Sequence, residues 1–550
     1  MRVLREYSRS QVPDVPLRED PGILLKAVGF PIAKELSIVS GLRLCSLLFS
    51  VVLVSSAQEM PELQKRITEF TLVNGLHVIV LERHDSPVIS FHTWVNAGSV
   101  DDPAGQSGMA HMFEHLTYKG SETLGTRNWV DEKKALDAAE DALNKAEAEA
   151  RKGVKADQIR VDGLRNQARQ AVETAQRFSA SAEYRRFLDE SGAENPQALA
   201  TTTYTENSYS LPSNRAELWF LMESQRLVRP AFREFYSERA LMLEESRQRA
   251  EGNTQGRMTS EVLAAAFKTH PYRNPVLGWP GDIQSLRRTD AQEFFERYYV
   301  PGNITVAMVG DITLADAKRL AEKYFGPMPA KPLPPRVTSQ EPTQLGPKTV
   351  VVEMPGPPVT MVGYKRPSQF DKDDIALDVL QIILSQGRSA MLYSDLVQEK
   401  RLAQQAQAMA TIPDGRFPSL FLFLLVPAQG RTVEENQKAL EEMLGRFKTT
   451  PIEPQLLSRA RAMGRSNLIR RMNSNRDMAA LLALHAGSYG DWHKLFTQLD
   501  DLNKLRAEDL QRVASRYFVA TGRTTLYCVQ PGQSNAAPAK APERRAGGPQ

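Results

Sequence analysis

The sequence predicts an α+β fold made of two similar, duplicated domains, each a mostly antiparallel sheet packed with helices, with a helical hairpin inserted in the first. A helix, an aromatic ending, a turn and an apolar strand occur at residues 286–311 and again at 502–530. Two helical segments also end near glycines, Gly120 and Gly387, in the same order relative to these repeats. Two copies of one α+β unit are the simplest account of the repeated landmarks.

The first copy carries extra residues between its landmarks, and composition places them at residues 127–186. This stretch is rich in Ala, Glu, Lys, Gln and Arg, which favours helix. Gly153 indicates a turn between two helices. The predicted apolar seam consists of Leu136, Leu143 and Ala150 on the first helix and Ile159, Leu164, Ala168 and Val172 on the second. We expect an antiparallel hairpin that is either a solvent-projecting spacer or a contact arm for a partner or substrate.

The repeats and the changes in composition predict five segments along the chain. They are an N-terminal extension with a signal peptide at 1–57, a first domain at 58–335 that contains the helical stretch 127–186, a linker at 336–347, a second domain at 348–531 and a disordered tail at 532–550. The linker lies in a proline-rich stretch, and the tail is rich in Ala, Pro, Gly and charged residues.

An apolar run at residues 44–54 predicts export. Arg43 precedes the run and the small residues 55–57 follow it, as at a signal-peptidase site. The run is short for a membrane span. Because residues 1–43 precede it, either the true start lies later or the segment remains as a membrane anchor. We expect a periplasmic or secreted protein.

Composition excludes several classes of function. The net charge is +4, from 69 basic and 65 acidic residues that are interspersed, so a dedicated nucleic-acid surface is not expected. The only two cysteines are Cys45 and Cys528, and Cys45 would leave with the signal peptide. No internal disulfide is therefore expected, and the fold must depend on its apolar core.

His111, Glu114 and His115, within His-Met-Phe-Glu-His, form the most informative motif of the chain. In a helix the two histidines lie about one turn apart, so both reach one metal ion, and Glu114 lies beside them. The order H-x-x-E-H is the inverted zincin motif. The flanking Met112 and Phe113 predict burial, and a metal ion would compensate the cost of burying two imidazoles and a carboxylate. The motif predicts a zinc site.

A catalytic zinc ion usually has three protein ligands and one position for water, so a third ligand must lie elsewhere. Glu238 and Glu245 are seven residues apart, or two helical turns, and share a helix face, whereas Glu244 points elsewhere. We assign Glu245 as the third ligand. Glu238 is assigned with Glu114 to the catalytic group, as a carboxylate that hydrogen-bonds and orients the ligands.

Several further motifs occur in order around this pentad, and together they carry a family resemblance. They are Tyr118-Lys119-Gly120-Ser121, SLPSNRAELWFLMESQRL, ERALMLEE and HPYRNPVLGWPGDI. From about Thr68 to about Pro531 the chain resembles the insulinase and pitrilysin family of zinc peptidases, in the short two-domain branch that includes mitochondrial processing peptidase.

The resemblance implies one Zn²⁺ per chain, with His111, His115 and Glu245 as ligands and Glu114 as the general base. In that chemistry zinc lowers the pKa of water and polarises the peptide carbonyl, and Glu114 carries the proton to the leaving amine. Neither a serine nor a cysteine nucleophile is needed.

The chain departs from the family pattern at two places. Relatives have an Asn-Ala-x-Thr edge strand for substrate, and the counterpart here is Gln197, Ala198, Leu199 and Ala200. Pairing with a peptide needs only backbone groups, so strand addition can survive this change. Relatives also have an Arg and a Tyr in the second domain, where this chain has Gln398 and Gln404.

In some members of the short branch, one subunit carries the zinc motif and the other subunit carries the Arg and the Tyr. We therefore expect a homo- or heterodimer with a subunit of similar fold, acting on a peptide or protein substrate, with membrane contact only through an uncleaved N-terminal segment. Two alternatives remain open. One is a non-catalytic scaffold subunit, and the other is a peptide-binding protein whose zinc is structural.

Overall fold

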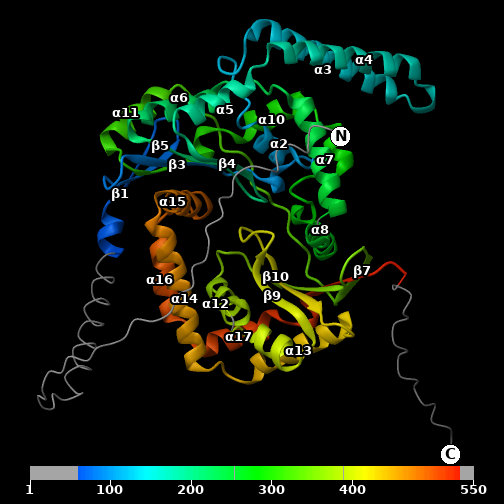
Figure 1. The fold of residues 1–550 in the computed structure, drawn as a ribbon, viewed down its shortest axis with the longest axis vertical. Coiled ribbons are helices and arrows are strands. Elements are labelled where there is room, and N and C mark those ends of the chain that lie inside the picture. The colour runs from blue at the N-terminus through cyan, green and yellow to red at the C-terminus, as the bar shows by residue number, and fades with distance from the viewer. Residues whose placement is uncertain (1–59, 253, 388, 533–550) are drawn as a thin grey trace, which may run out of the picture. The chain divides into compact units, whose positions relative to one another are not determined.

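The computed structural model describes residues 60–252, 254–387 and 389–532 (Figure 1). The expected signal peptide and the expected tail from residue 533 onward lie outside the described residues. Within the described ranges, no helix is both long enough and apolar enough to cross a membrane.

The first sheet has six strands in the order β1-β2-β6-β3-β5-β4. The strands are β1 (Ile67–Thr71), β2 (His77–Glu82), β3 (Val88–Val95), β4 (Glu194–Ala200), β5 (Thr205–Pro212) and β6 (Ile304–Gly310). Neighbouring strands are antiparallel except β2 and β6, which are parallel. β1 and β2 form a hairpin whose turn contains Gly75 at φ +96°, a conformation that favours glycine.

The second sheet repeats this arrangement with one strand fewer, in the order β7-β11-β8-β10-β9. The strands are β7 (Lys348–Glu353), β8 (Val359–Arg366), β9 (Ala403–Ile412), β10 (Ser419–Pro427) and β11 (Arg523–Val529). Again one pair, β7 and β11, is parallel, and it occupies the place of β2 and β6. The predicted α+β fold of two similar domains with mostly antiparallel sheets is confirmed.

The first half contains ten α-helices of the described chain, several of which cover the first sheet through a core of aromatic and aliphatic side chains. They are α2 (Met109–Leu116), α3 (Trp129–Ala150), α4 (Gln158–Phe178), α5 (Ser181–Glu190), α6 (Ala216–Val228), α7 (Phe235–Gly252), α8 (Thr254–Ala266), α9 (Pro280–Ser285), α10 (Arg288–Tyr298) and α11 (Leu314–Tyr324). Trp219 of α6 stacks on Phe91 of β3, with ring centroids 4.4 Å apart, and both are almost fully buried. This packing anchors α6 to the sheet.

The second sheet has a corresponding set of helices and its own apolar core. They are α12 (Asp374–Ser385), α13 (Val433–Thr449), α14 (Pro454–Asn473), α15 (Asn475–Tyr489), α16 (Lys494–Lys504) and α17 (Ala507–Tyr517). α17 followed by β11 corresponds to α10 followed by β6, as the repeated sequence landmarks predict. Gln344 and Glu341, in the proline-rich stretch between the sheets, hydrogen-bond to Arg523 O and to the backbone N–H groups of residues 268–270, respectively.

Each half contributes one helix to the sheet of the other half. Met258 and Val262 of α8 pack in the core against Met361 and Leu526 of the second sheet. Conversely, α15 lies against β3 and β6 of the first sheet. The approach is so close at Gly487 that a Cβ atom there would lie 2.2 Å from the indole nitrogen of Trp94. Because each sheet is packed against a helix from the other half, we expect the two halves to fold together.

α3 and α4 form an antiparallel pair that extends from the rest of the first half in Figure 1. The seam between them is made mostly of alanines: Ala135, Ala139, Ala142 and Ala146 on α3, and Val161, Ala168 and Ala175 on α4, with Leu136 also buried. The sequence interpretation is wrong at Ala150 and Ile159, which are exposed, Ile159 to 86%, because both residues lie near the turn between the helices, where the buried seam ends. At the base, Arg233 forms a buried ion pair with Glu132 at 2.8 Å.

Candidate active site

α2 carries the H-x-x-E-H motif, and its start is fixed by buried polar contacts. Asp102 accepts hydrogen bonds from the backbone N–H groups of Gly108 at 2.8 Å and Ala110 at 2.9 Å, which caps the first turn. Gly108 has φ +94°, and a Cβ atom there would lie 2.7 Å from Leu277 O. The cap and the close approach fix where α2 begins and therefore where its histidines lie.

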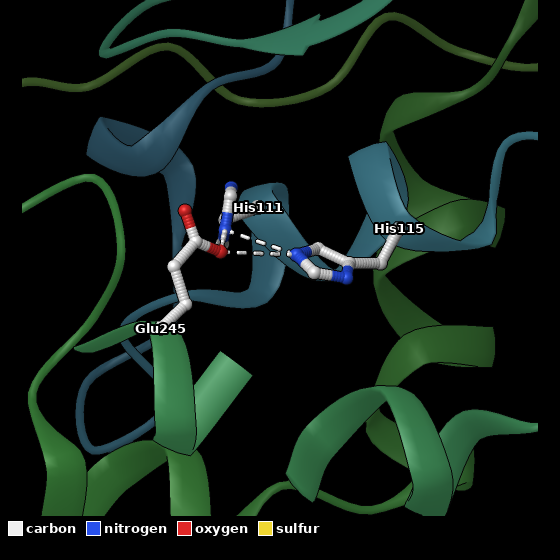
Figure 2. Close-up of side chains that lie close together, drawn as sticks. All are labelled: His111, His115 and Glu245. Carbon is white, nitrogen blue, oxygen red and sulfur yellow. Dashed lines mark hydrogen bonds and ion pairs between the residues drawn. The ribbon is translucent and has the colours of Figure 1, made fainter. Parts of the chain in front are cut away.

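His111 and His115 project from one side of α2 toward Glu245 of α7 (Figure 2). The distances are 3.2 Å from His111 Nε2 to His115 Nε2, 3.2 Å from His111 Nε2 to Glu245 Oε2, and 3.4 Å from His115 Nε2 to Glu245 Oε2. These three residues form a group of potential metal ligands. Local helix geometry explains the histidine pair, and the packing of α7 on α2 brings Glu245 to it.

The triangle of donor atoms fits a tetrahedral zinc site. With zinc–ligand distances of about 2.0–2.1 Å, tetrahedral geometry places neighbouring donor atoms about 3.3 Å apart. The three observed separations match this value within a tenth of an ångström or so. Two imidazole nitrogens and one carboxylate oxygen at such distances require a shared proton or a cation. Their chemistry, nitrogen and oxygen donors in a set of three, is that of catalytic zinc sites.

A second group of side chains holds His115 in place. Its Nδ1 donates to Glu238 Oε2 at 3.0 Å, which leaves Nε2 directed to the triangle. Lys119 Nζ lies 2.6 Å from Glu238 Oε1 and 2.9 Å from Glu234 Oε2, and Glu234 accepts hydrogen bonds from Ser179 and Ser181. Burial raises the pKa of Glu238, but the bonds from His115 and Lys119 outweigh it and keep the pKa low. Such partners fix the tautomer and orientation of a metal-binding histidine.

Glu114 lies between the triangle and the edge of the first sheet. Its Oε2 accepts a hydrogen bond from the backbone N–H of Ala200 at 2.9 Å and is 3.4 Å from His111 Nδ1. Burial raises the pKa of Glu114, but the contacts with His111 and Ala200 outweigh this effect and hold the pKa below its ordinary value. Glu114 is therefore ionised at neutral pH and can accept a proton beside β4.

Electrostatics within the triangle also favour a cation. Burial lowers the pKa of His111, but hydrogen bonds to Glu114 and Glu245 raise it to about 9. The hydrogen bond from His111, and after it the charges of His111 and Arg249, lower the pKa of Glu245 to about 2. In the metal-free protein a proton on His111 supplies the positive charge that the two carboxylates require.

β4 is the edge strand of the first sheet, next to β5. Gln197 and Leu199 are exposed on one face, whereas Ala200 is buried toward α2. One side of this strand therefore offers backbone groups for pairing with an extended chain. Gln398 and Gln404 stand where relatives have the Arg and the Tyr, and both are exposed. Gln398 lies in the π-helical turn Tyr393–Glu399, and Gln404 lies on β9.

Sequence reasoning missed Asp102, Lys119 and Glu234. None of them stands in a spacing relationship with the pentad that identifies a contact. Lys119 follows α2 closely, but only the tertiary structure shows that it reaches Glu238 and Glu234 on the other side of His115.

The class of this protein is defined by two features. One is the duplicated α+β fold, and the other is the set of two histidines and one glutamate that surround a common point. Residues 78–149 match the family model "Insulinase (Peptidase family M16)", and residues 285–463 match "Peptidase M16 inactive domain". The chain belongs to the insulinase family, peptidase family M16.

Relatives agree over most of the chain. It is 29% identical over 465 residues to the zinc protease PqqE of Helicobacter pylori, covering 83% of this chain and 91% of that protein. It is 21% identical to a probable mitochondrial-processing peptidase subunit beta of Arabidopsis thaliana, covering 83% and 76%.

Solved structures of similar fold also match most of this chain. A protease from Helicobacter pylori is similar with a TM-score of 0.70 and 25% identity, over 84% of this chain and 99% of that one. The periplasmic protease PqqL from Escherichia coli shares the fold with a TM-score of 0.61 and 13% identity, over 84% of this chain and 47% of that one.

Proposed function

We propose that this chain is a zinc-dependent metalloendopeptidase that hydrolyses peptides or unfolded protein segments. The observation that carries the proposal is the triangle of His111, His115 and Glu245, whose donor separations suit zinc, next to an ionised Glu114. The curated relatives named zinc proteases support the choice of metal. A zinc ion bound there would polarise the substrate carbonyl and lower the pKa of water.

Glu114 acts as the general base in this proposal. Its carboxylate accepts a proton from the attacking water and delivers the proton to the leaving amine. Glu238 and Lys119 hold His115 in one tautomer and orientation, so they are positioning residues. The residues that carry these roles lie in the first half, which we assign as the peptidase domain at 58–335, and we assign 348–531 as the inactive domain.

Substrate would bind as an added strand on β4, along Gln197, Ala198, Leu199 and Ala200. The free edge supplies backbone donors and acceptors for an extended peptide. The hydrogen bond from Ala200 N to Glu114 brings the end of this strand to the general base. A scissile bond near Ala200 would then lie beside the metal site.

We further propose that the chain works as the zinc-bearing subunit of a dimer with a protein of similar fold. The support is the presence of Gln398 and Gln404 where relatives have an Arg and a Tyr. The similarity to proteins named as beta subunits of a processing peptidase agrees with such a division. A partner would then supply the groups that stabilise the developing oxyanion.

The site of action is proposed to be the periplasm, after removal of residues 1–57. The apolar run at 44–54 supports this, as does the structural similarity to a protein described as a periplasmic protease.

The test is cleavage of a quenched peptide library by residues 58–550, with and without Glu114→Gln. We expect little hydrolysis by the lone chain. Together with its partner subunit it should show hydrolysis that chelator abolishes and that the variant loses while it retains its metal. Metal binding with hydrolysis unaffected by Glu114→Gln would reject the peptidase assignment. Full activity of the lone chain would reject the need for a partner but not the peptidase.

A further inference from the structure

We propose that the arginines of α14 and α15 form a cationic subsite that selects peptides with acidic side chains on the segment bound along β4. The inference rests on the proposed peptidase function and names the substrate class of that site.

The two helices carry an excess of positive charge that the rest of the chain does not share. The arginines are Arg459, Arg461, Arg465, Arg470, Arg471 and Arg476, and Asp477 is the single acidic residue in the two helices. Within the described part of the chain, none of the six lies at ion-pair distance from a carboxylate. Arginine usually finds a carboxylate partner when it is available, and basic and acidic residues are almost equal in number over the whole chain. The six guanidinium groups therefore lack an ion-pair partner in the described part of the chain, and Arg470, Arg471 and Arg476 form a basic surface at the junction of the two helices.

Arg476 places this surface against the edge strand. Its guanidinium donates to the side-chain Oε1 of Gln197 on β4, although the two residues belong to different halves of the chain. α15 lies against β3, β5 and β6, as Figure 1 also shows for β3. Arg83 fixes the junction between α14 and α15, because it donates to Met472 O at 2.8 Å and to Asn475 Oδ1 at 3.2 Å.

Arg471 brings positive charge to the other end of the same strand. Tyr204 lies in the turn after β4, and its ring stacks on Trp94 with centroids 3.6 Å apart. Burial, and after it the charges of Glu206 and Asp414, raise the pKa of Tyr204, whereas the charge of Arg471 lowers it. Arginines of the second half thus approach the strand near both Gln197 and Tyr204.

The alternation of side chains along a strand defines which part of a substrate meets these arginines. Gln197 and Leu199 are exposed on the face of the sheet that α15 covers further along, since they align across β5 with His92 and Trp94. A peptide added beside β4 would direct every second side chain to that face. Carboxylates at alternate positions would therefore meet guanidinium groups, which bind them in a bidentate manner.

The test measures binding separately from cleavage. The affinity of the full chain carrying Glu114→Gln is measured for two fluorescent peptides. One peptide has Asp or Glu at alternate positions, and the matched peptide has Asn or Gln at the same positions. We expect the acidic peptide to bind about three- to five-fold more tightly per acidic residue, with the preference lost at about 1 M salt. Replacement of Arg470, Arg471 and Arg476 by Gln should abolish the preference, so that the acidic peptide binds no more tightly than the neutral one.

Arg319→Gln is the matched control, because Arg319 is exposed on α11 and already pairs with Asp316 at 2.9 Å. It should keep the preference. Equal binding of the two peptides, no binding of either, or an equal loss of both in the arginine variant would overturn the subsite. If the preference holds in binding but the unmodified chain, assayed together with its partner subunit, cuts neither peptide, the subsite stands and the peptidase function fails.

Discussion

Glu238 joins His115 to Lys119: its Oε2 is 3.0 Å from His115 Nδ1 and its Oε1 is 2.6 Å from Lys119 Nζ. Through Glu234, the same lysine connects to Ser179 and Ser181, where the inserted hairpin rejoins the domain. The orientation of His115 therefore depends on residues that bind no metal themselves.

Glu238→Gln should weaken zinc binding about 10- to 100-fold, because the amide no longer accepts the imidazole N–H as strongly and no longer pairs with Lys119. Competition with a chromogenic chelator measures the affinity. Glu244→Gln is the control, since Glu244 is on the same helix but pairs with exposed Arg247. Equal effects of the two substitutions would show that Glu238 does not orient the ligand.

Zinc affinity should rise with pH and level off above about pH 9. In the metal-free protein the hydrogen bonds to Glu114 and Glu245 outweigh burial and hold the pKa of His111 at about 9. Below that pH zinc must displace the proton, which costs about tenfold in affinity per pH unit. Titrations between pH 6 and 9 test this slope. Affinity that is constant over this range would show that His111 is already neutral.

Gly487→Ala should destabilise the protein by about 1–3 kcal/mol, because a Cβ atom there would overlap Trp94 and push α15 off the first sheet. Denaturant unfolding followed by tryptophan fluorescence measures the loss. Gly445→Ala in α13 is the control, since nothing lies within 4 Å of a Cβ atom there, and it should be neutral or slightly stabilising. Equal stability of the two variants would contradict the packing of α15.

Arg233→Met should cost about 3–5 kcal/mol, because it leaves the carboxylate of Glu132 buried without its partner. The guanidinium also donates to Lys119 O, Ser121 O and Leu124 O, so its loss frees three backbone acceptors. Limited proteolysis should show earlier cleavage near the base of the hairpin. Arg186→Met, at an exposed arginine of α5, serves as the control, and a matching digestion pattern would refute an anchoring role for Arg233.

The sequence predicted the duplicated fold because the landmarks around residues 286–311 recur, and a repeated pattern specifies a repeated unit. It located the helix of His111 and His115 because their spacing is local. The sequence did not predict that α8 packs on the second sheet and α15 on the first sheet. Both helices look like ordinary amphipathic or apolar segments. The failure at Ala150 and Ile159 has a similar cause, because the sequence does not show where the buried seam ends near the turn between the helices.

The contacts of the site show the same limit. The hydrogen bond from Ala200 N to Glu114 and the bridge from Lys119 to Glu238 join segments that are far apart in the chain or lie on different helices. A single sequence carries no spacing signal for such contacts. Glu245 could be assigned as a ligand only because a third donor was required, because it shares a helix face with Glu238, and because the family resemblance implies a glutamate ligand at this position.

The most direct measurement is X-ray absorption at the zinc edge on residues 58–550 loaded with zinc, next to Glu245→Gln. The account predicts one zinc per chain with two imidazole nitrogens, one carboxylate and an exchangeable water, and loss of the carboxylate with weakened binding in the variant. A closed set of four protein ligands, or a spectrum that Glu245→Gln leaves unchanged, would contradict a catalytic zinc site at His111, His115 and Glu245.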